Sequence, residues 1–413
     1  MSFNPFNEKP ISIDTCFDDW IKLYPKAYDK EKTDPYTKTR IILMNGTEYE
    51  AVWYGHEFSR HCPNNDIRRE ISLIRRNEQQ QQKKLSSLKP IDESILETTI
   101  AYEQLAVDLT ASLAQNEKDK HVKESLEFVL LEDFDHLYRF ANLLEMDEGI
   151  SAKRLVGGYT EITPGRPTIS EHRYAIDDIK CHINNKKAAP ITKLNASIIT
   201  AAEQQTMNYY MNIGQFYKND LGRKLYSEIA MIEEEHVTEY GSLMDTNCTW
   251  LEGLLEHEYT ECYLYYSCLM DETDPKIKKI WDRCLTQEIA HLNIAKRLLR
   301  EYEGKDYLDI IPNPEFPTLL AIGSHKDYIR QVLKNTICNT GDLECHTKVD
   351  KLPSGAPFFK YQNLINKNVN GVASHVVIDQ YLKKNREDYR YEDKPHPVKE
   401  LQNRQMDNTT IAR

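Results

Sequence analysis

The hydrophobic pattern predicts long helices through the middle of the chain. Between residues 90 and 304, apolar side chains recur every three to four positions, which is the period of an amphipathic helix. Asp274-Pro275 is a helix-start signal, and Gly149 and Gly304 stand where helices should end. We therefore expect six helices, at residues 92–115, 119–147, 195–218, 222–244, 250–272 and 275–303.

The segments on either side lack this period. Residues 1–63 look irregular, and a strand-like run before the turn signal Asn45-Gly46 predicts a strand pair that ends near Tyr54. A polar helix is expected at 66–88. Beyond Pro312 we expect a short helix near 324–335, and then a charged tail whose last 25 residues form either an arm or a disordered segment.

These patterns divide the chain into six parts. We expect an N-terminal arm with a polar helix, a first helical hairpin, a crossover insert, two further hairpins and a C-terminal extension, at residues 1–89, 90–148, 149–194, 195–246, 247–304 and 305–413 respectively. The fold class is mainly α.

The three hairpins repeat one pattern of acids and histidine. Each has a glutamate, an acid 30 residues later, and a histidine three residues after that acid. Such regular spacing indicates triplication of one helical hairpin. The copies are Glu103, Asp133 and His136; Glu203, Glu233 and His236; and Glu258, Glu288 and His291.

The repeated residues lie within the apolar stripes of their helices. In the last helix, for example, Glu288 and His291 continue the stripe that Trp281 and Cys284 begin. A buried carboxylate without a partner costs several kcal/mol or becomes protonated. Six acids and three histidines on core-facing stripes therefore predict bound cations, and two facing hairpins would supply four carboxylates and two imidazoles around two metals.

These residues resemble the ligand set of the ferritin-like superfamily, and within it the rubrerythrin-like proteins. The resemblance covers residues 90–304 and implies a four-helix bundle with a carboxylate-bridged di-iron site. It also implies that Glu261, one turn after Glu258, is a further ligand. The chain departs from the family in having Asp133 in place of a glutamate and no CxxC pair for a rubredoxin iron, so the electron donor must be external.

Loop lengths leave two pairings of the hairpins open. The 67 residues between His136 and Glu203 allow a long crossover, whereas the 22 residues between His236 and Glu258 do not. This favours pairing the first hairpin with the second, and the third hairpin would then need a second subunit in a dimer or higher even-numbered homo-oligomer. In the alternative, the second and third hairpins pair and the first is left over.

Composition limits the binding partners and the cellular compartments that we expect. The net charge of −12 argues against nonspecific nucleic-acid binding, and no apolar run is long enough to span a membrane. The N-terminus lacks the features of a secretory signal. Nine cysteines without a CxxC pair are typical of a reducing compartment, so we expect a cytoplasmic protein.

The chemistry of the ligands suits iron, with manganese as the alternative. The resemblance implies a peroxidase-like oxidoreductase that reduces peroxide or O2; the alternatives are an iron-storing or assembly-forming protein and a manganese catalase. Tyr210 and Tyr265 lie on the site-facing stripes and are candidates for hydrogen bonding to ligands, although tyrosines that merely fill an aromatic core would show the same pattern.

Overall fold

The computed structural model describes residues 3–386 and 394–402, and these are mainly helical, as the sequence predicts. Most of the expected C-terminal arm or disordered segment (389–413) lies outside the described residues. The long helices are α2 (Pro35–His61), α3 (Asn65–Ser86), α4 (Ile95–Asn116), α5 (Lys120–Glu148), α8 (Pro190–Ile213), α9 (Asp220–Ser242), α10 (Trp250–Asp271) and α11 (Pro275–Glu303).

Shorter elements connect and extend these helices. They are α1 (Trp20–Leu23), α6 (Ala152–Leu155), α7 (Thr168–Glu171), α12 (Tyr307–Ile310), α13 (Lys326–Thr336), α14 (Pro357–Ile365) and α15 (Ala373–Asn385). The antiparallel pair β1 (Asn339–Asp342) and β2 (Cys345–Lys348) aligns Thr340 with Thr347. The six helices expected between residues 92 and 303, and the one near 324–335, are thus confirmed with small shifts at their ends.

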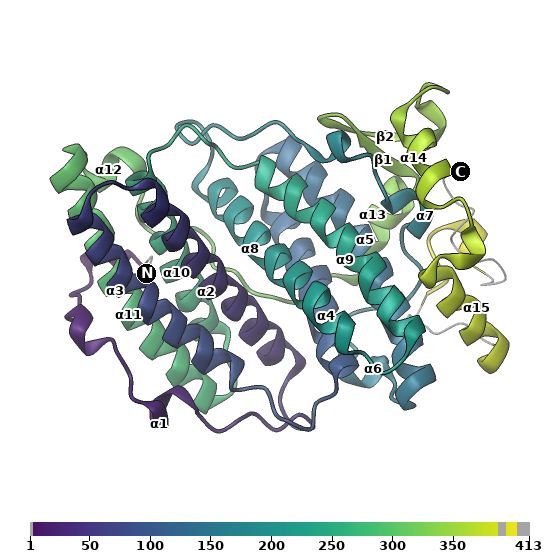
Figure 1. The fold of residues 1–413 in the computed structure, drawn as a ribbon, viewed down its shortest axis with the longest axis horizontal. Helices are drawn as coiled ribbons and strands as arrows, with labels where there is room; N and C mark the ends of the chain where they lie inside the picture. Colours follow the sequence, from purple (N-terminus) through teal and green to yellow (C-terminus); the bar gives the residue numbers. More distant parts are fainter. Residues whose placement is uncertain (1–2, 387–393, 403–413) are drawn as a thin grey trace. The chain divides into compact units, whose positions relative to one another are not determined.

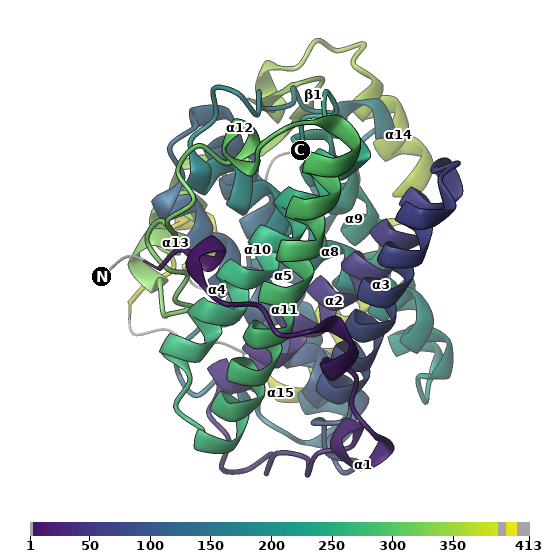
Figure 2. The ribbon, with the colours of Figure 1, turned by 90° about the vertical axis from the view of Figure 1, so that its left-hand side faces the viewer.

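The chain forms two compact units, each built from segments that are distant in sequence. Unit 1 comprises Met1–Asp92, Ile183–Gln205 and Met244–Ala321, and unit 2 comprises Glu93–His182, Thr206–Leu243 and Ile322–Arg413. In unit 1 the hairpin α2–α3 packs against the hairpin α10–α11, so purple and green helices lie side by side in both views (Figures 1 and 2). In unit 2, α5 packs against α9, and α13 and α15 cover α5.

The expected strand pair near Asn45-Gly46 is wrong, because this segment lies within helix α2. The helix starts at Pro35, after the N-cap residue Asp34. Asn45 and Gly46 lie inside this helix, where they pack against neighbouring helices and form no turn. The Asn45 amide donates to the Gln82 carbonyl on α3, and a Cβ at position 46 would lie 2.7 Å from Gln205 Cβ. Tertiary packing therefore overrides the local turn preference.

The helical core is a duplication in which α8–α9 and α10–α11 repeat α2–α3 and α4–α5. α2 and α8 begin at Pro35 and Pro190, which are 155 residues apart, and the same shift relates α3 to α9, α4 to α10 and α5 to α11. Their capping residues recur at the same shift: Asn64 and Asn219, the capping boxes begun by Ser94 and Thr249, and the left-handed glycines Gly149 and Gly304. The described part of the chain thus contains four such hairpins, one more than the sequence repeat predicts.

Among the described residues, no helix is both long enough and apolar enough to cross a membrane. All nine cysteines are free thiols, and Cys262, Cys268 and Cys284 are buried.

Candidate metal centre

Unit 2 brings the predicted ligands of the first and second hairpins together. Glu103 lies on α4, Asp133 and His136 on α5, and Glu233 and His236 on α9, and each is at most 1% exposed. Glu233 sits between the two histidines, with its oxygens 3.0 Å from His136 Nδ1 and 3.1 Å from His236 Nδ1. The acids and histidine of the first hairpin thus lie beside those that α9 carries, as the preferred pairing of the first and second hairpins predicts.

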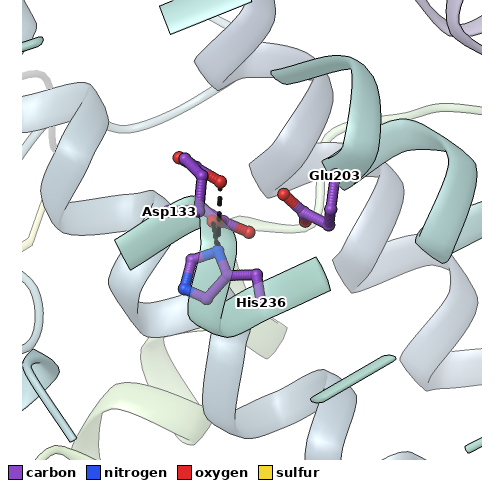
Figure 3. A group of neighbouring side chains, drawn as sticks. Asp133, Glu203 and His236 are labelled. Atoms are coloured by element: carbon purple, nitrogen blue, oxygen red, sulfur yellow. Dashed lines mark hydrogen bonds and ion pairs between the residues drawn. The ribbon is translucent and has the colours of Figure 1, made fainter. Parts of the chain in front are cut away.

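Glu203 reaches this group from α8. The division between the units falls within that helix, after Gln205, so one continuous helix carries Glu203 and the part of α8 that belongs to unit 2. Ligand atoms of Asp133, Glu203, Glu233 and His236 all lie within 4.8 Å of one another. Figure 3 shows Asp133, Glu203 and His236 converging on the same space. All six residues predicted for these two hairpins therefore form one centre.

Positive charge stabilises the ionised carboxylate at the middle of this centre. Burial acts to raise the pKa of Glu233, but hydrogen bonds and charge from His136 and His236 outweigh it and lower that pKa. His236 Nε2 also lies 2.8 Å from Glu132, and His136 Nε2 lies 3.8 Å from Glu171. Each histidine therefore has its Nδ1 directed at ligand carboxylates and its Nε2 directed at an outer carboxylate, the arrangement found around metal-ligating histidines.

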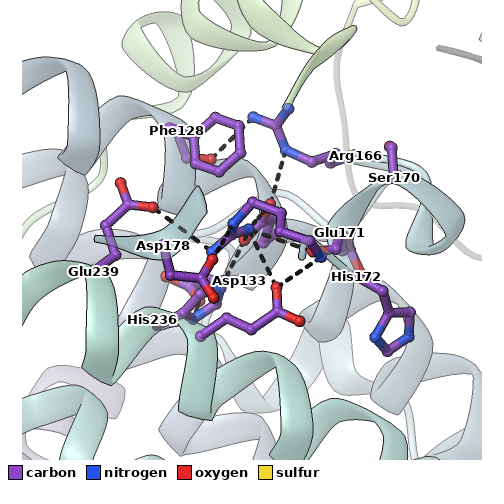
Figure 4. Close-up of polar contacts among 12 residues, drawn as sticks. Phe128, Asp133, Arg166, Ser170, Glu171, His172, Asp178, His236 and Glu239 are labelled. Carbon is purple, nitrogen blue, oxygen red and sulfur yellow. Dashed lines mark hydrogen bonds and ion pairs between the residues drawn. The ribbon is translucent and has the colours of Figure 1, made fainter. Parts of the chain in front are cut away.

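The insert between the hairpins encloses this centre with buried charges (Figure 4). Arg173 contacts Glu132 at 2.7 Å and Asp178 at 2.8 Å, and Arg166 Nε lies 3.3 Å from Glu132. Although burial acts to raise the pKa of Glu132, Arg173 and the other cations lower it to about 2. The carboxylate that orients His236 therefore remains ionised. The sequence carries no spacing signal for this network.

Unit 1 contains a second centre around the third hairpin. Its predicted ligands Glu258 and Glu261 lie on α10 and Glu288 and His291 on α11, all at 0% exposure. His291 Nδ1 is 2.9 Å from Glu288 and 3.7 Å from Glu258. Ligand atoms converge within 4.8 Å in two groups that share Glu258, one with Glu261 and Glu288 and the other with Glu78 and His291.

The remaining residues of the unit 1 centre come from the N-terminal hairpin. Glu48 on α2 and Glu78 on α3 are buried at 0% and 2% exposure. They are 30 residues apart, and Gln81 follows three residues later, so α2–α3 is a fourth copy of the repeat with glutamine in place of histidine. The signal that marks this copy is the shift of 155 residues that leads from Glu203, Glu233 and His236 to Glu48, Glu78 and Gln81. The Gln81 amide donates a hydrogen bond to Glu288.

This hairpin bears on the expectation that the third hairpin shares its site with a second subunit. The third hairpin was expected to complete its site with a copy from another chain, because the sequence repeat left it without a partner. Glu48 and Glu78 supply that half of the centre from the same chain. The count of half-sites is therefore even within one chain, and the ground for expecting a site shared between subunits disappears.

Glu258 shows most clearly that the unit 1 centre lacks positive charge. Neither of its carboxylate oxygens has a hydrogen-bond partner, and it is fully buried. Burial and the neighbouring acids Glu78, Glu288 and Glu48 raise its pKa well above the usual value. Burial and nearby carboxylates likewise raise the pKa of Glu78, to about 8. A divalent cation would supply the missing charge.

Both predicted tyrosines donate hydrogen bonds to the first glutamate of the facing hairpin. Tyr210 Oη lies 2.6 Å from Glu103, and the Tyr265 hydroxyl bonds Glu48. Each tyrosine follows its own hairpin's first glutamate by seven positions. They therefore orient candidate ligands in equivalent ways in the two units.

No family model matches the sequence, and no curated protein or solved structure matches it either.

Proposed function

We propose that the protein is a ferritin-like carboxylate metalloprotein with two dinuclear iron centres, which reduces hydrogen peroxide or O2 in the manner of rubrerythrins. The supporting observation is the pair of fully buried donor sets built from one repeated pattern. Manganese is the alternative metal, because carboxylates and neutral imidazoles suit both ions. Electrons would come from an external donor, since the chain has no CxxC pair for a rubredoxin iron.

The donor chemistry of both centres fits such metals. In unit 2, Glu103, Asp133, His136, Glu233 and His236, with Glu203 from α8, would hold two ions. In unit 1 the corresponding set is Glu48, Glu78, Glu258, Glu288 and His291, and Glu261 adds a carboxylate where Gln81 replaces a histidine. The fully buried Glu258, whose oxygens lack hydrogen bonds, is the sign that a cation belongs there.

The bound metals would supply the electrons for cleaving the O–O bond of the substrate. The protein's own residues prepare the site for this. Buried helices exclude water, and Glu132, held by Arg173, keeps His236 oriented by accepting a hydrogen bond from its Nε2. Tyr210 and Tyr265 hold Glu103 and Glu48 in place. These contacts pre-organise the ligands.

Anaerobic loading with Fe(II), followed by elemental analysis, tests the proposal. We expect about four iron ions per chain, two in each centre. Glu233→Gln in unit 2 and Glu258→Gln in unit 1 should each remove about half of them. Glu256→Gln is the matched control, because Glu256 lies on the same helix as Glu258 but pairs with Lys193. Its iron content should be that of the wild type.

Reaction of the loaded protein with peroxide then separates an enzyme from an iron store. Rapid, stoichiometric oxidation of the iron, monitored by Mössbauer spectroscopy, and repeated turnover with an added electron donor would support the oxidoreductase. Iron bound well in excess of the two centres, without turnover, would instead indicate storage. A folded protein that binds no iron would contradict the proposal altogether.

A further inference from the structure

Three tyrosines of unit 2 form a chain from the metal centre towards the surface. Tyr210 contacts Tyr226 with ring centroids 5.6 Å apart, and Tyr226 contacts Tyr217 at 5.5 Å. Tyr210 and Tyr226 are at most 1% exposed, whereas Tyr217 is 5% exposed and its neighbour Phe216 is 79% exposed. Aromatic rings therefore connect Glu103, which Tyr210 contacts, with the outside of the unit.

Each hydroxyl of the chain has a defined partner. Tyr210 donates to Glu103, and Tyr226 pairs with Thr99 at 2.7 Å. At the outer end, Tyr217 donates to Asp147 at 2.7 Å, and Asp147 also accepts a hydrogen bond from Asn219. A carboxylate in contact with a phenol can take its proton when the phenol is oxidised. Asp147 gives the outermost tyrosine this acceptor.

The repeated architecture shows that only the inner part of this chain recurs. A shift of 55 residues leads from Tyr210 and Tyr226 to Tyr265 and Trp281, whose ring centroids lie 6.1 Å apart, but it leads from Tyr217 to Glu272. Shifting Tyr210, Tyr226 and Tyr217 back by 155 residues leads to Gly55, Ile71 and Cys62 in unit 1. Other aromatic contacts do recur under the same shift. Tyr102 stacks on Tyr209 in unit 2, and the equivalent residues His257 and Tyr54 stack in unit 1.

The helix that faces Tyr217 makes room for its ring. A Cβ at Gly222 would lie 2.1 Å from Tyr217 Cε1, so only glycine fits there with the ring in place. The equivalent residue of unit 1 is Ile67. Unit 2 therefore has a glycine that leaves space for the Tyr217 ring, whereas unit 1 has a larger residue at the equivalent position.

We propose that these three tyrosines deliver electrons to the unit 2 centre during peroxide reduction, and that Tyr217 is the residue that receives electrons from outside the protein. The proposal rests on the proposed function. The loaded centre would supply one of the two electrons, Tyr217 supplies the other, and the phenol proton moves to Asp147. The O–O bond of hydrogen peroxide breaks, two protons from solvent are consumed, and two waters form. A one-electron donor in solution then reduces the tyrosyl radical, which regains its proton from Asp147, and a second equivalent of the donor, acting through the same tyrosines, would restore the electron taken from the centre.

Electron paramagnetic resonance on the iron-loaded protein tests this proposal. Protein loaded with Fe(II) and treated with peroxide in the absence of a donor should show a tyrosyl radical signal. We expect Tyr217→Phe to lower the radical yield, and the rate of oxidation of ferrocyanide by peroxide, by at least about tenfold, a change of about 1.4 kcal/mol in barrier. Asp147→Asn should lower both in the same direction, because the ring remains but its proton acceptor is lost.

Matched controls separate electron transfer from packing. Tyr263→Phe removes the hydroxyl of another buried tyrosine, one that bonds the Thr318 carbonyl in unit 1, and should change neither measurement. Iron content and melting temperature should match the wild type in Tyr217→Phe. In metal-free protein, a photo-oxidised ruthenium complex should also generate a long-lived radical that Tyr217→Phe removes.

The outcomes distinguish this proposal from the proposed function. If iron binds and peroxide is reduced, but no tyrosyl radical forms or Tyr217→Phe behaves as wild type, the electron path is overturned while the function stands. If no iron binds in unit 2, both are overturned.

Discussion

Asn77 Oδ1 lies 2.9 Å from His291 Nε2, and this contact has a counterpart in unit 2. There Glu132 lies 2.8 Å from His236 Nε2. Asn77 and Glu132 are 55 residues apart, as are His236 and His291. The two hairpin pairs thus use the same position to hold the outer nitrogen of a histidine, which leaves Nδ1 to face the ligand carboxylates.

Removing this outer contact should weaken metal binding in one unit only. In Asn77→Leu the Nε2–H of His291 loses its acceptor, so we expect metal affinity at the unit 1 centre to fall about 10- to 100-fold. Competition titration with a chelator would measure the two classes of site separately. The unit 2 centre of the same molecule is the control, and an equal loss in both units would show that the effect is not local.

Completing the fourth repeat should strengthen the unit 1 centre. Gln81 occupies the position of a histidine, and Gln81→His would add an imidazole beside Glu78 and Glu288. Because imidazole is a better ligand than an amide, we expect at least about tenfold tighter binding of the second ion in unit 1. Calorimetric titration with Mn(II) would measure this. Unchanged affinity would mean that position 81 does not face the bound ions.

Glu258→Gln should change stability in opposite directions with and without metal. The substitution removes a buried carboxylate whose oxygens accept no hydrogen bond, and with it the cost of burying its charge or of protonating it, so the metal-free protein should unfold at a higher temperature. In the wild type, metal at 100 times its dissociation constant should add about 2.7 kcal/mol per site, and the variant should lose much of this gain. Thermal unfolding with EDTA and with Mn(II) measures both effects. A variant that is less stable in EDTA would contradict this reasoning.

A buried ion pair fastens the N-terminal hairpin in unit 1. Arg40 on α2 contacts Glu272 at 3.1 Å, and Trp281 Nε1 donates to the same carboxylate. Arg40→Met leaves Glu272 buried without its cation and should cost about 3–5 kcal/mol at neutral pH. Urea unfolding would measure this loss, and Arg69→Met, which removes an exposed ion pair with Asp66 on α3, is the control.

The same pair predicts how the stability difference depends on pH. Burial acts to raise the pKa of Glu272, but the hydrogen bonds and charge of Arg40 outweigh it and lower that pKa. A lowered folded-state pKa gives stability that is fully present above the unfolded value of about 4.3 and is lost as the pH falls through the folded value. The gap between wild type and Arg40→Met should therefore narrow below about pH 4. A gap that widens on acidification would contradict the assignment.

The candidate ligands could be predicted from the sequence because their signal is local. The spacing of 30 and three residues follows from the length of a hairpin and the pitch of a helix, so Glu233 and His236 were identifiable without a fold. The helix ends were equally predictable from Asp274-Pro275 and Gly304, because capping depends on neighbouring residues.

Only the tertiary structure decided which hairpins share a centre. Glu78 stands in a polar helix, and Gln81 breaks the histidine pattern, so local sequence does not mark the N-terminal hairpin as a partner of Glu258. Asn45-Gly46 is a turn signal by local preference, and only packing against α8 makes it helical. Arg173 reaches Glu132 from an irregular insert. Such contacts join residues that are far apart in the chain. They are stabilised by burial in the folded protein, and they produce no periodic pattern in the sequence.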